Sequence, residues 1–248
     1  MIKLINTLGL FSIKASITAL YRSKALWFLP LVMLVASTIT VASATQVVDK
    51  EALQQMKFNV YLDKKEIGYH EVEITTTPTG ERVNVEAKFD VKYLFIDVFK
   101  YLHKAQEVWT AKCLSSIVAE TVENGDILFI RSNGTGENGS LTIENNEGSK
   151  ELSGCIRSFA YWDVERLRTD YLLNTQTGGY VRAKLTLIGS SLIEIQGLLY
   201  PAEKYLLRAE EADIELWYDQ SDQWLALKTK VKGGRILSYL RNNLGKSK

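Results

Sequence analysis

Alternation of apolar and polar residues dominates the chain beyond residue 50. Within residues 83–93 every second residue is apolar, and the residues between them are polar or charged. This pattern is typical of an antiparallel strand with one face on a core and the other in water. Residues 58–62 and 67–77 have the same character and are joined by the polar residues 63–66. We therefore expect consecutive antiparallel strands here.

Turn signals divide the rest of the chain in the same way. Asn124-Gly125 is a strong hairpin signal. Such signals recur at intervals of roughly 8–15 residues, as in a β-sandwich or barrel. The chain has only 3 prolines, which argues against long disordered linkers. We predict a mainly all-β fold: one curved antiparallel sheet, or a partly open β-barrel, forming a single domain over residues 45–248.

Residues 158–174 interrupt the β pattern and are the best candidate for a helix. Leu167, Tyr171 and Leu172 would lie near one face at helical spacing. Asp163 has a side chain suited to capping the helix N-terminus. We predict one short helix near 158–174, covering one end of the sheet.

The N-terminal region is typical of an export signal. Residues 25–44 form an apolar run behind four basic residues and end in Ala42-Ser43-Ala44, a small-x-small cleavage pattern. We expect cleavage after Ala44, so that residues 1–44 are a signal peptide. The remaining 204 residues would then be periplasmic or secreted.

An uncleaved anchor is the alternative interpretation of the same residues. A helix needs roughly 20 apolar residues to span a bilayer, which is about the length of 25–44. Serine and threonine dilute the second half of the run, and this favours cleavage. In the alternative, residues 25–44 hold the same domain at the inner membrane.

The charge of the exported part excludes one class of partner. The full chain has 30 basic and 29 acidic residues, and residues 1–44 hold four basic and no acidic ones. The exported part therefore has a net charge of −3, with the two signs interspersed. A nucleic-acid-binding domain would show a basic stripe or patch, so no nucleic-acid partner is predicted.

Two cysteines, Cys113 and Cys155, both lie in the exported part. In an oxidising compartment two such cysteines are expected to form a disulfide. The competing interpretation is a pair of buried free thiols. Catalytic thiol chemistry is disfavoured because the two are not in a CxxC arrangement.

Several strings suggest a family. They are FNVYLDKKEIGYH (58–70), AKFDVKYLF (87–95), KYLHKAQEVWTAKCLSSI (100–117), GCIRSFAYWD (154–163), LLNTQTGGY (172–180) and DIELWYDQSDQWLAL (213–227). In these strings the sequence resembles DUF6134, a group of uncharacterised exported bacterial proteins that is itself similar in organisation to DUF3108 domains. This resemblance implies a single, strongly curved antiparallel β domain, and it implies no reaction and no site residues.

Catalytic candidates are few. The chain lacks GxSxG, HExxH, P-loop and dinucleotide-binding motifs, and we predict no cofactor. His103 and Glu107 could share one face of a strand and act as acid and base, with Asp163 as a third candidate. Two histidines are too few for most His-rich zinc sites, and we predict no metal. A structural role for the histidines is the favoured interpretation.

Two aromatic-rich stretches are candidates for ligand contact. Residues 91–102 are unusually apolar, so a hairpin tip at 95–99 could touch a membrane or gate an apolar cavity. Residues 158–163 could stack on a ring or plug one end of the sheet. The predicted contacts are Phe95, Ile96, Val98, Phe99, Tyr161 and Trp162.

These observations favour an exported, non-catalytic domain that binds an apolar or amphipathic molecule, or that supports assembly of the cell envelope. A curved antiparallel sheet can enclose one small ligand. A hydrolase acting on envelope polymers is the second hypothesis, and a structural or protein-interaction domain is the third.

Overall fold

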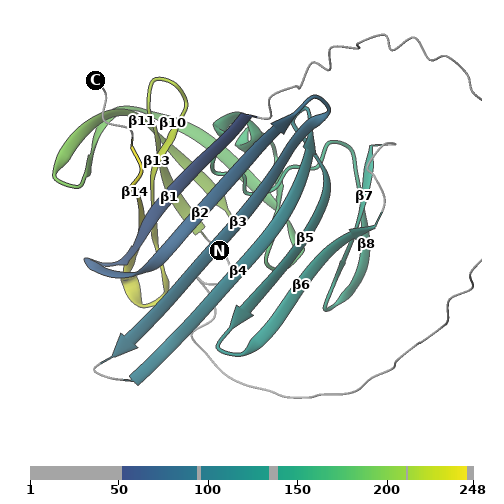
Figure 1. Cartoon of the computed structure of the whole chain (residues 1–248), viewed down its shortest axis with the longest axis horizontal. Helices are drawn as coiled ribbons and strands as arrows, with labels where there is room; N and C mark the ends of the chain where they lie inside the picture. The colour runs from purple at the N-terminus through teal and green to yellow at the C-terminus, as the bar shows by residue number, and fades with distance from the viewer. Residues whose placement is uncertain (1–51, 94–95, 134–138, 211, 245–248) are drawn as a thin grey trace, which may run out of the picture.

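The computed structural model describes residues 52–93, 96–133, 139–210 and 212–244, so the predicted signal at 1–44 lies outside the described part. Within these ranges the chain forms one antiparallel sheet of fourteen strands, in the order β8-β7-β6-β5-β4-β3-β2-β1-β14-β13-β12-β11-β10-β9 (Figure 1). The predicted all-β fold is confirmed. No helix among the described residues is long and apolar enough to cross a membrane.

The strands follow one another as a meander. The first eight are β1 (Ala52–Leu62), β2 (Lys65–Thr77), β3 (Gly80–Tyr93), β4 (Ile96–Thr110), β5 (Cys113–Glu123), β6 (Asp126–Asn133), β7 (Ser140–Asn145) and β8 (Gly148–Ser153). The last six are β9 (Tyr171–Leu173), β10 (Tyr180–Ile195), β11 (Leu198–Ala209), β12 (Ala212–Tyr218), β13 (Trp224–Lys230) and β14 (Ile236–Arg241). Pairing of β1 with β14 joins the two ends of the meander into one sheet.

The alternation noted in the sequence places the core. Val83, Val85, Ala87 and Phe89 of β3 are all buried on the inner face. Large aromatic side chains fill the interior behind them, including Trp109 and Trp224, neither of which is exposed. Hydrophobic burial on one face of each strand is therefore what curls the sheet around its core.

The predicted hairpin at Asn124-Gly125 joins β5 to β6. Both residues have positive φ, 52° for Asn124 and 96° for Gly125. Asn and Gly tolerate this left-handed conformation better than other residues, and a two-residue hairpin turn needs it twice. The sequence signal and the backbone geometry agree.

The segment after β8 closes the curled sheet. The backbone N–H of Leu114 in β5 donates to the carbonyl of Ile156 at 2.8 Å. On the other side, the N–H of Leu173 in β9 donates to the carbonyl of Arg157, also at 2.8 Å. This segment therefore lies between β5 and β9. We call residues 155–179 the strap.

The predicted helix at 158–174 is mostly absent. One 3-10 turn, η1 (Val164–Leu167), forms there, and Tyr171–Leu173 is the strand β9. Asp163 does cap η1, since its carboxylate accepts from the N–H of Glu165 at 2.9 Å. Residues 171–173 are extended rather than helical because Leu172 and Leu173 are fully buried and pair with β10. Local helical spacing was overridden by tertiary pairing.

Candidate ligand cavity

A cavity of about 40 Å³ lies inside the curled sheet. This volume holds about three water molecules at roughly 10–15 Å³ each. Strands β2, β3, β4 and β14 supply one part of its wall, and the strap supplies the rest. The strap residues that line the cavity are Phe159, Tyr161, Trp162, Asn174, Thr175 and Gln176.

Three residues that line the cavity each carry a buried polar atom with no hydrogen-bond partner in the protein: His70 Nδ1, Tyr161 OH and Trp162 Nε1. The three side chains are 8%, 5% and 7% exposed. An unsatisfied buried polar group costs about 1–3 kcal/mol. Three such groups around one cavity indicate that water or a ligand satisfies them.

Both histidines of the chain line the cavity. His70 packs edge-on against the rings of Trp224 and Tyr239, with centroids 5.7 and 5.4 Å away. His103 Nδ1 lies 2.8 Å from Thr121 Oγ1. Burial lowers the pKa of each histidine to about 3, because the charged imidazolium loses its hydration there. Both rings are therefore neutral at physiological pH.

Glu107 lies on the same strand as His103, four residues further on, and is 2% exposed. Its Oε2 accepts from Trp109 Nε1 at 2.8 Å and from Ser158 Oγ at 3.3 Å. Burial raises the pKa of this carboxyl to about 7, against the lowering effect of those two hydrogen bonds and of the Arg166 charge. The cavity thus holds a carboxyl that titrates near neutral pH.

Replacing Glu107 by glutamine tests this environment. The folded pKa of about 7 lies above the ordinary value of 4.5. The folded protein therefore binds the Glu107 proton more tightly than the unfolded chain does. As pH rises between those two pKa values, Glu107 lowers the free energy of unfolding. We expect the difference in free energy of unfolding between E107Q and the wild type to shift in favour of E107Q by about 3 kcal/mol from pH 4.5 to pH 8. Urea unfolding of both proteins at both pH values measures this shift.

Glu86→Gln is the matched control for that measurement. Glu86 is a largely solvated carboxyl whose pKa is lowered, chiefly by the hydrogen bond from Tyr69. The free energy of unfolding of E86Q should therefore not rise relative to that of the wild type between pH 4.5 and pH 8. Equal pH dependence in E107Q and the wild type would contradict the raised pKa of Glu107.

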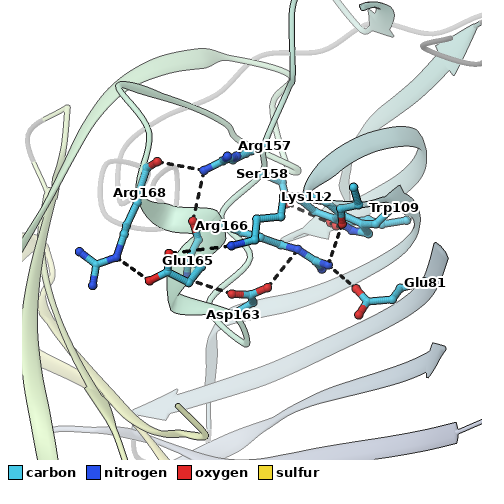
Figure 2. A network of polar contacts seen from close by, with 11 residues as sticks. Glu81, Trp109, Lys112, Arg157, Ser158, Asp163, Glu165, Arg166 and Arg168 are labelled. Atoms are coloured by element: carbon cyan, nitrogen blue, oxygen red, sulfur yellow. Dashed lines mark hydrogen bonds and ion pairs between the residues drawn. The ribbon is translucent and has the colours of Figure 1, made fainter. Parts of the chain in front are cut away.

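An ion-pair network around one buried arginine fixes the strap beside the cavity (Figure 2). Arg166, 4% exposed, pairs with Glu81 on the sheet and lies 3.2 Å from Asp163 on the strap. Its guanidinium lies 4.4 Å from the ring centroid of Trp109. The same indole donates to Glu107, so one aromatic ring joins the Arg166 network to the cavity wall.

Two further links hold the strap at its ends. The structure contains the predicted Cys113–Cys155 disulfide, with Cα atoms 5.0 Å apart, which ties the strap to the start of β5. At the other end, Asn145 Nδ2 on β7 donates to the carbonyl of Thr177 at 2.6 Å. Cavity closure therefore depends on bonds between segments that are distant in sequence.

The structure separates the catalytic candidates. His103 and Glu107 both line the cavity, as their shared strand face predicted, whereas Asp163 does not line it. Asp163 instead caps η1 and pairs with Arg166. Within the described residues, no three His, Cys, Asp or Glu side chains are grouped to hold a metal ion.

The structure places only some of the predicted ligand contacts at the cavity. Tyr161 and Trp162 line the cavity. Phe99 is buried in the core and Val98 is 47% exposed, and these two border a separate surface groove. Phe95 and the side chain of Ile96 lie outside the described part of the structure.

Sequence reasoning missed His70 as a cavity residue. A signal was present, because His70 has the same parity along β2 as Val72 and Ile74, both of which are buried. Tyr239 and Gln176 were missed as well. They reach the cavity from β14 and from the end of the strap, and no local pattern connects those segments to β2 or β4.

Comparison with known proteins identifies the family of this chain. The family model described as "Domain of unknown function (DUF6134)" matches residues 58–241. The chain belongs to the DUF6134 family. The matched range of this DUF6134 domain contains the cavity and the whole strap. Among curated proteins, none matches the chain.

One solved structure is similar in fold. It is described as a β-barrel-like protein of domain of unknown function DUF1849 from Brucella abortus. The TM-score is 0.57 at 9% sequence identity, and the alignment covers 76% of the DUF6134 chain and 94% of the other. At this identity the likeness shows the fold alone. Similarity to DUF3108 domains stays a prediction.

Proposed function

We propose that this DUF6134 domain is an exported, non-catalytic binding domain whose interior cavity takes the hydrogen-bonding end of an amphipathic molecule. The observation that carries the proposal is the set of three buried, unpartnered polar atoms around one cavity. Export is supported by the disulfide and by the predicted signal at residues 1–44.

The chemistry of the cavity favours a neutral head group. The two histidines are uncharged near neutral pH, and Arg166 does not line the cavity. Glu107 supplies a carboxyl that would repel an anion once it is ionised. Trp162 Nε1 can only donate, while Tyr161 OH can donate or accept. A hydroxyl or amide group of a few heavy atoms fits both this volume and these partners.

The mouth of the cavity suits the apolar portion of such an amphipathic ligand. Phe159 and Thr175 are half-buried, and the other lining residues are buried. Both half-buried residues belong to the strap, so the route to solvent passes along it. The exposed part of Phe159 offers an aromatic surface to the apolar portion of a ligand whose polar end is inside.

Native mass spectrometry tests the proposal. The full chain, recovered from the exported fraction under mild conditions, should carry a bound small molecule. W162F removes a donor from a cavity residue and should weaken ligand affinity about tenfold, the effect expected for losing one hydrogen bond to a buried partner, so that less ligand remains bound after recovery.

Trp217→Phe is the matched control. Trp217 is also a buried tryptophan with an unpartnered Nε1, but it belongs to a separate cluster away from the cavity. W217F should keep the ligand. Repeatedly ligand-free wild-type protein, or equal loss in both variants, would overturn the proposal.

A hydrolase is the second candidate, and one observation favours it. A carboxyl with a pKa near 7 in a cavity can act as a general acid or base. The other two predicted members do not complete a site, because His103 is held neutral and Asp163 lies outside the cavity. Turnover of an envelope polymer that is abolished in E107Q would support the hydrolase over simple binding.

A further inference from the structure

The hairpin of β10 and β11 extends beyond the rest of the sheet. Strand β11 pairs with β12 only from Glu203 onward, so residues 191–202 form a two-stranded extension. We call this extension, together with the adjoining residues 187–190, the ribbon. One face of the ribbon packs on the outside of the sheet. Ile193, Ile195 and Ala202 are buried there in a small cluster with Trp217 of β12. Figure 1 shows the β10–β11 hairpin projecting away from the barrel.

The opposite side and tip of the ribbon are also apolar. Five large aliphatic side chains are between 49% and 62% exposed there: Leu187, Ile188, Leu192, Leu198 and Leu199. Within residues 185–202 the single charged residue is Glu194. A solvated ribbon with one packed face would be polar on the other, so this concentration of exposed aliphatic residues indicates an interaction surface.

The composition of this surface disfavours a protein partner. A standard stable interface uses about 20–30 residues on each side, far more than the five exposed here. Energetically dominant interface residues are enriched in Trp, Tyr and Arg, and leucine is under-represented. The exposed set is wholly aliphatic, which suits the apolar face of an interfacial segment that is buried toward the acyl chains.

The pairing register shows which end of the sheet the ribbon occupies. One row of paired residues crosses the sheet from β1 to β11: Asn59, Leu240, Ala226, Trp217 and Lys204. Four antiparallel pairings separate β1 from β11, so these two strands run in the same direction. The ribbon and Ala52, the first residue of β1, therefore project from the same end of the sheet.

The chain preceding β1 limits the distance from this end to a membrane. Seven residues, 45–51, separate the apolar run 25–44 from Ala52. At about 3.5 Å per residue they span at most about 25 Å. While residues 25–44 are in the bilayer, before cleavage or without it, the ribbon end is held close to the lipid surface.

We propose that the exposed aliphatic side of the ribbon docks on the surface of a lipid bilayer, as a second attachment beside residues 25–44. Residues 25–44 would supply the attachment itself, and the aliphatic surface adds apolar area buried in the interface. This placement orients the domain with the ribbon end toward the lipid. Val98 and Phe99, the described part of the predicted contact at 95–99, lie at the other end, near the start of β4.

Photocrosslinking in vesicles tests this surface. The full chain is reconstituted in phosphatidylcholine vesicles with p-benzoylphenylalanine in place of Leu199, and separately in place of Leu192. Lipid adducts are quantified by mass spectrometry. The same substitution at Ile127 and at Val98, which are 57% and 47% exposed, provides matched positions away from the ribbon.

We expect about fivefold more lipid adduct at either ribbon position than at Ile127 or Val98, as for a segment held in the interface. Two ribbon positions keep the test valid if one substitution disturbs the fold. Equal labelling at all four positions would overturn the proposal. So would preferential labelling at Val98, or adducts from Leu199 to a second copy of the chain.

Discussion

Replacing both cysteines by serine should lower the free energy of unfolding by about 4 kcal/mol, the loop-closure effect expected for a cross-link across 42 residues of sequence separation. For a domain of this size, that corresponds to a fall in Tm of about 8–16 °C. The cross-link also lies where the sheet closes, next to the hydrogen bond between Leu114 and Ile156. Calorimetry of C113S/C155S under oxidising conditions measures the change.

Reductant provides the internal control for this prediction. Adding a dithiol should lower the Tm of the wild type toward that of C113S/C155S and leave the variant unchanged. A double variant as stable as the oxidised wild type would show that the strap is held by its other contacts. In that case the network around Arg166 and the bond from Asn145 to Thr177 would be the main fastenings.

The strand pattern was predictable because it is encoded locally. Alternation over residues 83–93 places an apolar face on the core whichever strand lies alongside, and Asn124-Gly125 specifies a tight turn by its backbone preferences. The misassigned segment at 158–174 behaves differently. Its strand β9 exists because Leu172 and Leu173 pair with β10, a partner that local spacing does not reveal.

The cavity was predictable only in part, for a related reason. His103, Glu107 and the aromatic pair Tyr161 and Trp162 stood out by residue type. Their convergence depends on how far the sheet curls and on the path of the strap across its open side. Asp163 was the wrong third member, because the cap that it forms for η1 directs it to Arg166.

The proposed binding and the closure of the cavity would both depend on the strap. The strap carries two of the three unpartnered cavity atoms, Tyr161 OH and Trp162 Nε1, and both half-buried residues at the mouth. Its backbone pairs with the sheet only in short stretches, at Ile156 and at β9, and the disulfide and side-chain contacts described above supply its other fastenings. A ligand larger than the resting cavity would therefore enter by displacing the strap, and the strength of the fastenings would control access.

Arg166→Met should destabilise the domain by about 2 kcal/mol, because it removes charged hydrogen bonds to two carboxylates that are only 29% and 32% exposed, and removes the charge from the face of Trp109. Methionine keeps an unbranched apolar stem for packing. The Arg166 charge also lowers the pKa of Glu107, so R166M should raise that pKa further above 7. Urea unfolding and carboxyl titration by NMR measure the two effects.

Arg168→Met distinguishes this network from an ordinary surface pair. Arg168 is two residues away, pairs with Glu165 at 2.7 Å and also lies over an aromatic ring, that of Tyr205. Its side chain is 46% exposed, however, against 4% for Arg166. Water replaces a lost surface partner at little cost, so R168M should change stability by less than about 1 kcal/mol. It should also leave the pKa of Glu107 unchanged. If both variants lost the same stability, burial would not be the reason that Arg166 matters, and the strap would need another explanation for its position over the cavity.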